Sequence, residues 1–254
     1  MPSVIIYGGS VIGACVDFYL AERGANVTAV KRAGSANGAS GRSGGFLALY
    51  WYQGTPVDPL ARQSFDLHVN LSERVGTDWG SRRVQTLGIA ASSRRNLSRL
   101  RSAQAPDWLR PHAAAHNQLG TPETTAQVTP EFFTKGMLKA SGTEMIEGAV
   151  EGVIMEGERT IGVLVDGKPL TADPTVIAMD PWSLLACQWL PSVCGLKGHS
   201  LVFRYTPDDP KALFVELENE YGEVSPPKSC RAQTVRLLSA AFPVKRRYPS
   251  TRPT

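Results

Sequence analysis

Apolar positions at the start of the chain follow the pattern of a strand, a turn, a helix and a second strand. Residues 3–7 form a short apolar run that predicts a buried strand, and residues 8–13 predict the turn that follows it. The pattern then predicts a helix over residues 14–23, ending at Gly24, and a second strand over residues 26–30. This order predicts a β–α–β unit and therefore a parallel sheet.

Later segments alternate in the manner of strands. Residues 149–155, 160–165 and 168–172 predict a three-strand meander, with Asp166 and Gly167 as a hairpin turn. Further strands are predicted over residues 175–179, 201–205 and 212–217. Between these β regions, residues 58–75 predict a helix with Asp58 as N-cap and Pro59 in the first turn, whereas residues 80–145 give no clear pattern.

Composition and charge narrow the class of protein. The chain has 254 residues, of which 42% are hydrophobic, so it is long enough for one large or two modest domains. No run approaches 18 apolar residues and no signal peptide precedes the first strand, so we expect no membrane span. The four cysteines show neither a C-x-x-C pair nor a zinc spacing, which favours a reducing cytoplasm.

The basic charge is concentrated at the C-terminal end. The net charge is +4, yet residues 225–254 contain seven Lys or Arg and no Asp or Glu. The remainder is therefore net acidic, and the charge does not indicate a nucleic-acid partner. The histidines His112 and His116 have the i, i+4 spacing of a helical metal site, but no third ligand accompanies them, so we expect no metal.

The first turn carries a modified dinucleotide-binding fingerprint. Gly8 permits the tight turn and Gly13 permits close packing of helix and strand, as in G-x-G-x-x-G. Ser10 stands in place of the second glycine, and Lys31 stands where an acid normally accepts hydrogen bonds from ribose hydroxyls. Three interpretations stay open: a weakened dinucleotide site, an NADP site that uses the Lys31 cation, and an ordinary β–α–β unit without a ligand.

Residues 34–45 are rich in glycine and serine and lead directly into the apolar run F-L-A-L-Y-W. A flexible linker is one interpretation. The abrupt apolar continuation favours a loop that contacts phosphate at the edge of a pocket.

In this order the segments resemble the FAD-dependent oxidoreductases of the D-amino acid oxidase and glycine oxidase superfamily, cytoplasmic eukaryotic branch, over residues 3–224. The resemblance rests on G-G-x-V-I-G, A-S-G-R-S-G-G-F, the meander, V-I-A-M-x-P-W-S and G-L-K-G-H-S. It implies an α/β fold with a Rossmann-like FAD-binding domain over 1–194, an inserted segment over about 52–145, and the start of an incomplete mixed-sheet substrate domain over 195–224. It leaves 225–254 as a divergent basic tail, which we expect to lie outside the fold.

The resemblance also implies site residues and chemistry. FAD would be the cofactor, an amine or amino acid the small-molecule substrate, and hydride transfer to flavin N5 the reaction; no catalytic residue can be nominated. The residues implied at the cofactor are Gly8, Gly9, Ser10, Val11, Ile12 and Gly13 at the pyrophosphate, Lys31 and Arg32 at the ribose, Ser40, Ser43, Gly44 and Gly45 along the pyrophosphate, Val150 at the adenine, and Asp180 and Trp182 near the flavin.

Several features depart from this family pattern. Ser10 and Asp180 replace glycines and Lys31 replaces a glutamate. Residues 227–254 fit a reading frame shifted by one base, or alternative splicing, so we expect a truncated chain; the alternative is a genuine basic tail with a weak nuclear address at residues 245–247. The hypotheses are therefore an FAD-dependent amine or amino-acid oxidase, an impaired remnant or non-enzymatic binding protein, and an NADP-binding reductase.

Overall fold

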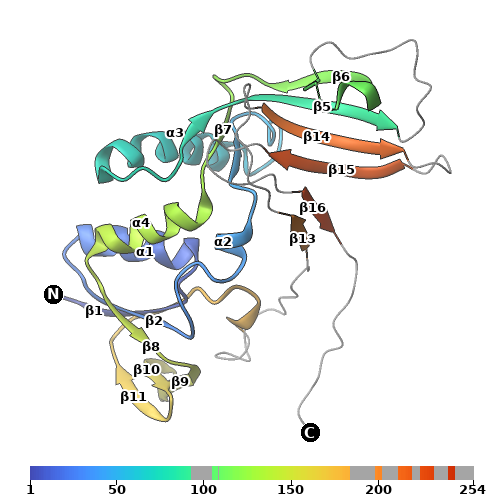
Figure 1. The fold of residues 1–254 in the computed structure, drawn as a ribbon. Helices are drawn as coiled ribbons and strands as arrows, with labels where there is room; N and C mark the ends of the chain where they lie inside the picture. Colours follow the sequence, from blue (N-terminus) through green and yellow to red (C-terminus); the bar gives the residue numbers. More distant parts are fainter. Residues whose placement is uncertain are drawn as a thin grey trace, which may run out of the picture. The chain divides into compact units, whose positions relative to one another are not determined.

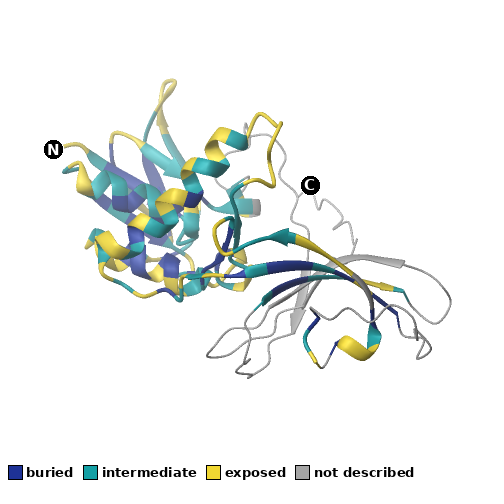
Figure 2. Cartoon of the chain, turned by 90° about the horizontal axis from the view of Figure 1, so that it is seen from above, coloured by how far each residue is buried: buried dark blue, intermediate teal, exposed yellow. Residues whose placement is uncertain are grey.

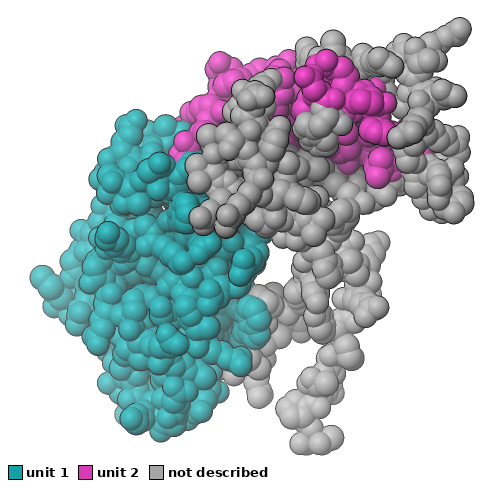
Figure 3. Space-filling view, viewed as in Figure 1, with its two compact units in different colours: residues 1–45, 69–80, 128–195 teal, residues 46–68, 81–127, 196–254 magenta. Residues whose placement is uncertain are grey.

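The computed structural model describes residues 1–92, 105–107, 109–183, 198–201, 211–218, 224–231 and 240–243. The chain divides into two units, each described by itself. Unit 1 comprises residues 1–45, 69–80 and 128–195, and unit 2 comprises residues 46–68, 81–127 and 196–254 (Figure 3).

Unit 1 is built on a parallel sheet. Its strands are β1 (Ser3–Tyr7), β2 (Asn26–Lys31), β8 (Glu144–Glu147) and β12 (Thr175–Ile177), in the order β12-β1-β2-β8. Helix α1 (Val11–Glu22) connects β1 to β2, and helix α4 (Pro130–Ser141) leads into β8 (Figure 1). A parallel sheet with helical connections is the predicted Rossmann-like α/β fold, which is confirmed.

The two faces of the parallel sheet bury different side chains because neighbouring residues of a strand point to opposite sides. Val4, Ile6 and Val27 face the helix side, with Val16 and Leu20 of α1 against them. The opposite face packs against the meander of β9 (Val150–Glu156), β10 (Arg159–Val165) and β11 (Lys168–Thr171), through residues such as Ile5, Tyr7 and Val163. The buried residues of the strands form the core of unit 1 (Figure 2).

The predicted meander is confirmed in its turn chemistry as well as its strands. Asp166 and Gly167 both have positive φ values, 47° and 73°, as the tight hairpin turn between β10 and β11 requires.

Helix α1 is tied to α4 by a buried carboxylate. Asp17 is fully buried and accepts hydrogen bonds from the hydroxyls of Ser141, at 2.8 Å, and Thr143. Burial raises the pKa of the Asp17 carboxyl, while these two hydrogen bonds act in the opposite direction. The pair of hydroxyls thus holds the end of α4 against the middle of α1.

Unit 2 contains a mixed sheet. Strands β5 (Gln85–Ser92), β6 (Ala113–Gly120), β14 (Lys211–Glu218) and β15 (Val224–Arg231) lie in the order β15-β14-β5-β6; β5 and β14 are parallel, and the other two pairings are antiparallel. One face is buried by Leu87, Ile89 and Leu213 with Leu109 and Ala113. Strand β15 includes residues that the sequence assigns to the basic tail, and the domain boundaries stay a prediction.

The remaining elements are short, apart from α3. Strands β3 (Phe46–Ala48), β7 (Thr125–Gln127) and β4 (Arg82–Arg83) form one small sheet, and β13 (Gly198–Leu201) pairs with β16 (Ala240–Pro243). Helix α3 (Asp58–Val75) ends where predicted and begins at Asp58, which is its first residue rather than its N-cap, with its carboxylate on Arg62. Two single turns of 3-10 helix, η1 (Arg110–His112) and η2 (Asp180–Trp182), precede β6 and follow β12, and α2 (Ala39–Arg42) is a short helix.

Several predictions from the sequence change at this level. Helix α1 begins at Val11 rather than at residue 14, and residues 34–45 are not a continuous loop because they include α2. The strand predicted over residues 201–205 is observed only as β13, and residues 202–205 lie outside the described part. His112 and His116 lie on η1 and on strand β6, so they do not share a helix face.

Candidate dinucleotide-binding site

The order of the parallel strands places a site at one edge of the sheet. Strand β2 lies on one side of β1 and strand β12 on the other, so the chain changes direction between β1 and β12. Ligands of open α/β sheets bind outside the carboxyl ends of the strands at such a position. The residues that follow β1 and β12 are Gly8 and Ala178, and the Ala178 N–H donates to the Tyr7 carbonyl at 2.8 Å.

The glycine turn has no room for side chains at two positions. Gly8 has a φ of 117°, and a Cβ there would lie 2.0 Å from the Ala178 carbonyl oxygen. A Cβ at Gly13 would lie 2.1 Å from the Gly8 carbonyl oxygen. The turn therefore brings the first turn of α1 directly against the backbone of β1 and of the segment after β12. Gly9 differs, because its Cβ would meet its nearest atoms at 3.6 Å, an ordinary contact distance.

Ser10 does not strain the turn. It precedes α1 with an extended backbone, φ −86° and ψ 176°, which any residue adopts. Its hydroxyl donates to the Ala178 carbonyl at 3.2 Å instead of capping the helix. The substitution at this position therefore changes the space and polarity around the turn and leaves its backbone path intact.

Asp180 brings a carboxylate to the same place. It lies in η2 with a φ of 51°, a left-handed conformation that glycine adopts without strain and most other residues avoid. Burial raises the pKa of its carboxyl, and a hydrogen bond from Ser10 opposes that rise. The Ser10 hydroxyl has one proton for two acceptors, the Ala178 carbonyl and the Asp180 carboxylate, so it satisfies one at a time.

The N-terminus of α1 is a position that favours an anion, because its first N–H groups lack partners within the helix. The Val11 N–H instead donates to the Ser40 hydroxyl at 2.9 Å, which brings the buried Ser40 of α2 to the start of α1. The first turn of α1 contains no acidic residue. Asp180, close to Ser10, is thus the carboxylate that the tertiary structure brings to this helix end.

Lys31 ends β2 beside the turn. Its ammonium group lies 3.4 Å from the Ser35 hydroxyl. A Cβ added at Gly9 would lie 3.6 Å from the Lys31 Cβ and 3.8 Å from its Cδ. The Ala36 N–H donates to the Gly9 carbonyl at 3.0 Å, which fixes this loop against the turn. Lys31 therefore lies where the sequence places it, at the edge of the site, and it supplies hydrogen-bond donors only.

The other predicted site residues divide into those near the turn and those held elsewhere. Arg32 is exposed next to Lys31, Ile12 is 58% exposed on α1, and Ser43 is exposed at the end of α2, followed by Gly44. Gly45 contacts a different backbone: its Cβ would lie 2.1 Å from the Val128 carbonyl oxygen, and its own carbonyl accepts the Val128 N–H. Its φ of 57° thus has a packing reason.

Val150 and Trp182 complete the predicted set. Val150 begins β9, pairs with Val165 and packs on the core between the meander and the parallel sheet. It lies two positions after Gly148, whose N–H donates to the Lys31 carbonyl at 2.8 Å. Trp182 is half exposed at the end of η2. Ala178 was not among the predicted site residues, although the end of a predicted parallel strand was the signal for it.

In the part of the chain that the structure describes, no group of three or more His, Cys, Asp or Glu side chains is placed to hold a metal ion. None of the helices in that part combines the length and the apolar character needed to cross a membrane.

Comparison with known proteins identifies a shared domain. The model of the FAD dependent oxidoreductase family matches residues 3–229. A Schizosaccharomyces pombe protein named as a putative oxidoreductase is 28% identical over 171 residues, covering 59% of this chain and 42% of the relative. The Saccharomyces cerevisiae putative oxidoreductase TDA3 is 32% identical over 102 residues, covering 37% and 19%. The chain thus spans less than half the length of these curated relatives.

Solved structures share the fold. Glycine oxidase from Bacillus cereus superposes with a TM-score of 0.73 at 22% identity, covering 96% of this chain and 73% of that one. L-proline dehydrogenase from P. horikoshii gives 0.70 at 15% identity, covering 98% and 73%.

Proposed function

Because this chain belongs to the family of FAD-dependent oxidoreductases, we propose that unit 1 binds FAD at the carboxyl ends of β1 and β12 and that the complete protein oxidises a C–N bond. The substrate class is an amine or an amino acid, in keeping with the printed names of the structural neighbours, glycine oxidase and L-proline dehydrogenase. When bound, the flavin supplies the acceptor for the substrate hydride at its N5 atom.

The observation that carries the proposal is the glycine turn. Gly8 and Gly13 bring the backbone and the N-terminus of α1 to the switch point between β1 and β12, and a side chain at either position would collide with a carbonyl oxygen. This backbone fits a dinucleotide diphosphate, which binds at a helix N-terminus through N–H groups and a positive helix dipole. The residues of the turn would hold the diphosphate, with Ser40 beside them at the start of α1.

Three side chains do not fit the cofactor as well as the backbone does. Asp180 adds a negative charge beside the helix end that a diphosphate would use. Ser10 adds a hydroxyl at the turn, and Lys31 offers no acceptor for ribose hydroxyls. We therefore infer that this chain holds FAD weakly.

A second candidate function follows from the same three side chains. Asp180 is a non-glycine residue in a left-handed conformation, which glycine adopts most easily. We infer that this backbone first carried a glycine and that the aspartate replaced it. A chain that keeps the scaffold and no longer retains flavin would be a catalytically impaired remnant or a protein that acts by binding.

Visible absorbance after dialysis tests the proposal. We expect the purified chain to lose most added FAD, and the variant Ser10→Gly/Lys31→Glu/Asp180→Gly to retain a flavin band between about 370 and 450 nm. Lys168→Glu, a charge reversal at an exposed position of β11, is the control and should behave as the unmodified chain. Equal FAD dissociation constants for the triple variant and the unmodified chain would refute the roles assigned to the three residues.

A further inference from the structure

A cavity of about 400 Å³ lies on the mixed sheet of unit 2, and its lining includes none of the predicted dinucleotide-binding residues. Its lining residues come from three adjacent strands: Gly88, Ile89 and Ala90 of β5, His116, Asn117 and Leu119 of β6, and Phe214 and Glu216 of β14. This volume falls in the range of small-molecule sites.

The sequence of the three strands explains why the sheet is hollowed here. Gly88 pairs with Phe214 on one side and with Asn117 on the other, and Ala90 pairs with Glu216. Directly paired residues share a face, so Gly88 and Ala90 form a low floor beside the larger Phe214 and Glu216 of β14, with Asn117 on the other side of Gly88. The Asn117 side chain leans over the floor, because a Cβ at Gly88 would lie 2.2 Å from its Oδ1.

One end of the cavity is aromatic. The Phe214 ring contacts Trp51 at 4.9 Å and Phe46 at 5.2 Å between ring centroids, both edge-to-face. The Trp51 indole N–H donates to the carbonyl oxygen of Leu119, itself a lining residue, at 3.2 Å. Trp51 is therefore held against two lining residues, through its ring on Phe214 and its indole nitrogen on Leu119.

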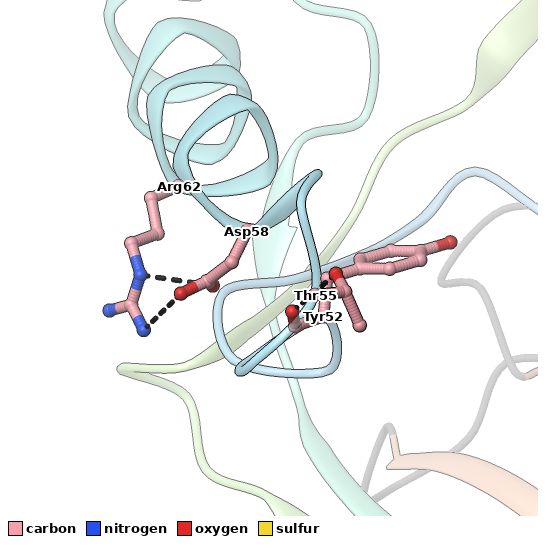
Figure 4. Close-up of polar contacts among 4 residues, drawn as sticks. All are labelled: Tyr52, Thr55, Asp58 and Arg62. Carbon is pink, nitrogen blue, oxygen red and sulfur yellow. Dashed lines mark hydrogen bonds and ion pairs between the residues drawn. The ribbon is translucent and has the colours of Figure 1, made fainter.

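Local side-chain contacts hold residues 50–62, the segment that carries Trp51. Thr55 donates through its hydroxyl to the Tyr52 carbonyl at 2.7 Å, and Asp58 accepts two hydrogen bonds from Arg62 at 3.0 and 3.1 Å (Figure 4). The Arg62 guanidinium also lies 4.7 Å from the centre of the Tyr50 ring. Tyr50 and Tyr52, the two neighbours of Trp51, thus each have a contact within this segment.

The charged group in the lining indicates which kind of ligand the cavity favours. Glu216 is the carboxylate of the cavity, and the described lining residues include no lysine or arginine. Phe214 lies two positions before Glu216 on β14, which places an aromatic ring and a carboxylate on one face of the same strand. A carboxylate and aromatic rings together favour an organic cation, through charge-assisted hydrogen bonds and cation–π attraction.

From this arrangement we propose that the cavity binds a small primary amine as its ammonium ion, with Glu216 contacting the charged group and Phe214 contacting the apolar body. The site thereby favours an amine over a carboxylate-bearing ligand. The inference goes beyond the proposed function and does not depend on it, because the binding step requires no flavin.

Calorimetric titration of the flavin-free chain with benzylamine at pH 7.5 tests this site, with benzyl alcohol and phenylacetate as neutral and anionic ligands of similar shape. We expect benzylamine to bind at least tenfold more tightly than either. Glu216→Gln should weaken its binding about tenfold, which corresponds to the loss of one charge-assisted interaction. Glu218→Gln makes the same change on the same strand outside the lining and should have no effect.

Ala90→Leu provides a second variant, because Ala90 is exposed and the larger side chain fills the floor without entering a core. It should abolish benzylamine binding and leave the thermal unfolding midpoint within about 2 °C. Binding that is absent, unaffected by Glu216→Gln, or equal for the three ligands would overturn the inference. Benzylamine binding without FAD binding would refute the proposed oxidation and support the cavity, whereas FAD binding without benzylamine binding would do the reverse.

Discussion

Replacing Asp180 by asparagine removes one negative charge at the start of α1 and keeps a side chain of the same shape. Asparagine also tolerates the left-handed backbone, so the φ of 51° is not a reason for η2 to rearrange. The variant therefore isolates the effect of the carboxylate on an anion bound at the helix N-terminus.

The size of that effect follows from charge and distance. Asp180 is half-buried and hydrogen-bonds with Ser10, the residue immediately before α1. We take one helical turn, about 5.4 Å, as the separation between the carboxylate and the bound anion. Two unit charges at that separation repel by about 0.8 kcal/mol in bulk water and about 3 kcal/mol at an effective dielectric constant of about 20. Between these limits we expect Asp180→Asn to lower the dissociation constant for FAD about tenfold.

Quenching of FAD fluorescence on titration with protein measures this constant. Asp173→Asn is the control, because Asp173 is an exposed aspartate of the same unit, paired with Arg159 at 2.7 Å. Because burial raises the pKa of Asp180, affinity in the unmodified chain should also increase as the pH is lowered from 7 toward 5, and this increase should be smaller in Asp180→Asn. Equal dissociation constants for Asp180→Asn and Asp173→Asn would refute the argument.

Three further predictions concern unit 1. Gly13→Ala should destabilise the fold by about 3 kcal/mol, because its Cβ would lie 2.1 Å from a backbone carbonyl oxygen, whereas Gly9→Ala should change the free energy of unfolding by less than about 1 kcal/mol; urea denaturation distinguishes them. Asp17 has a raised pKa in the folded state, so its contribution to stability is fully present below its unfolded pKa, near 3.9, and is lost as the pH rises through the folded value. The free energy of unfolding of Asp17→Asn should therefore rise relative to that of the unmodified chain between pH 4 and 7. A constant difference between the two chains across that range would contradict this. Cys15, with its pKa raised by burial to about 11, should react with iodoacetamide at pH 8 about 100-fold more slowly than a thiol of pKa 9.0; peptide mass spectrometry follows the reaction, and a rate that urea does not increase would show the burial argument to be wrong.

Local sequence was sufficient for elements whose geometry depends on their own residues. Gly8 and Gly13 predict the turn after β1 because other residues cannot approach neighbouring backbone so closely. Asp166 and Gly167 predict the hairpin between β10 and β11 because that turn requires two positive φ values. The pattern over residues 80–145 did not reveal strand β5. One face of β5 is buried by residues distant in the sequence, such as Leu109 and Leu213, and its other face carries the small residues Gly88 and Ala90.

The tertiary structure alone decided what surrounds the dinucleotide turn. Ser10 and Ala178 are 168 positions apart, and they meet because β1 and β12 are neighbours in the parallel sheet. The same pairing places the Asp180 carboxylate beside Ser10 and the start of α1, so two separate departures from the family pattern meet at one site. The sequence by itself predicted the glycine turn, because that turn depends on local backbone requirements. The order of its segments carried the resemblance that implied the family and the cofactor class. Which side chains compete with the cofactor depends on contacts between distant residues, and only folding creates them.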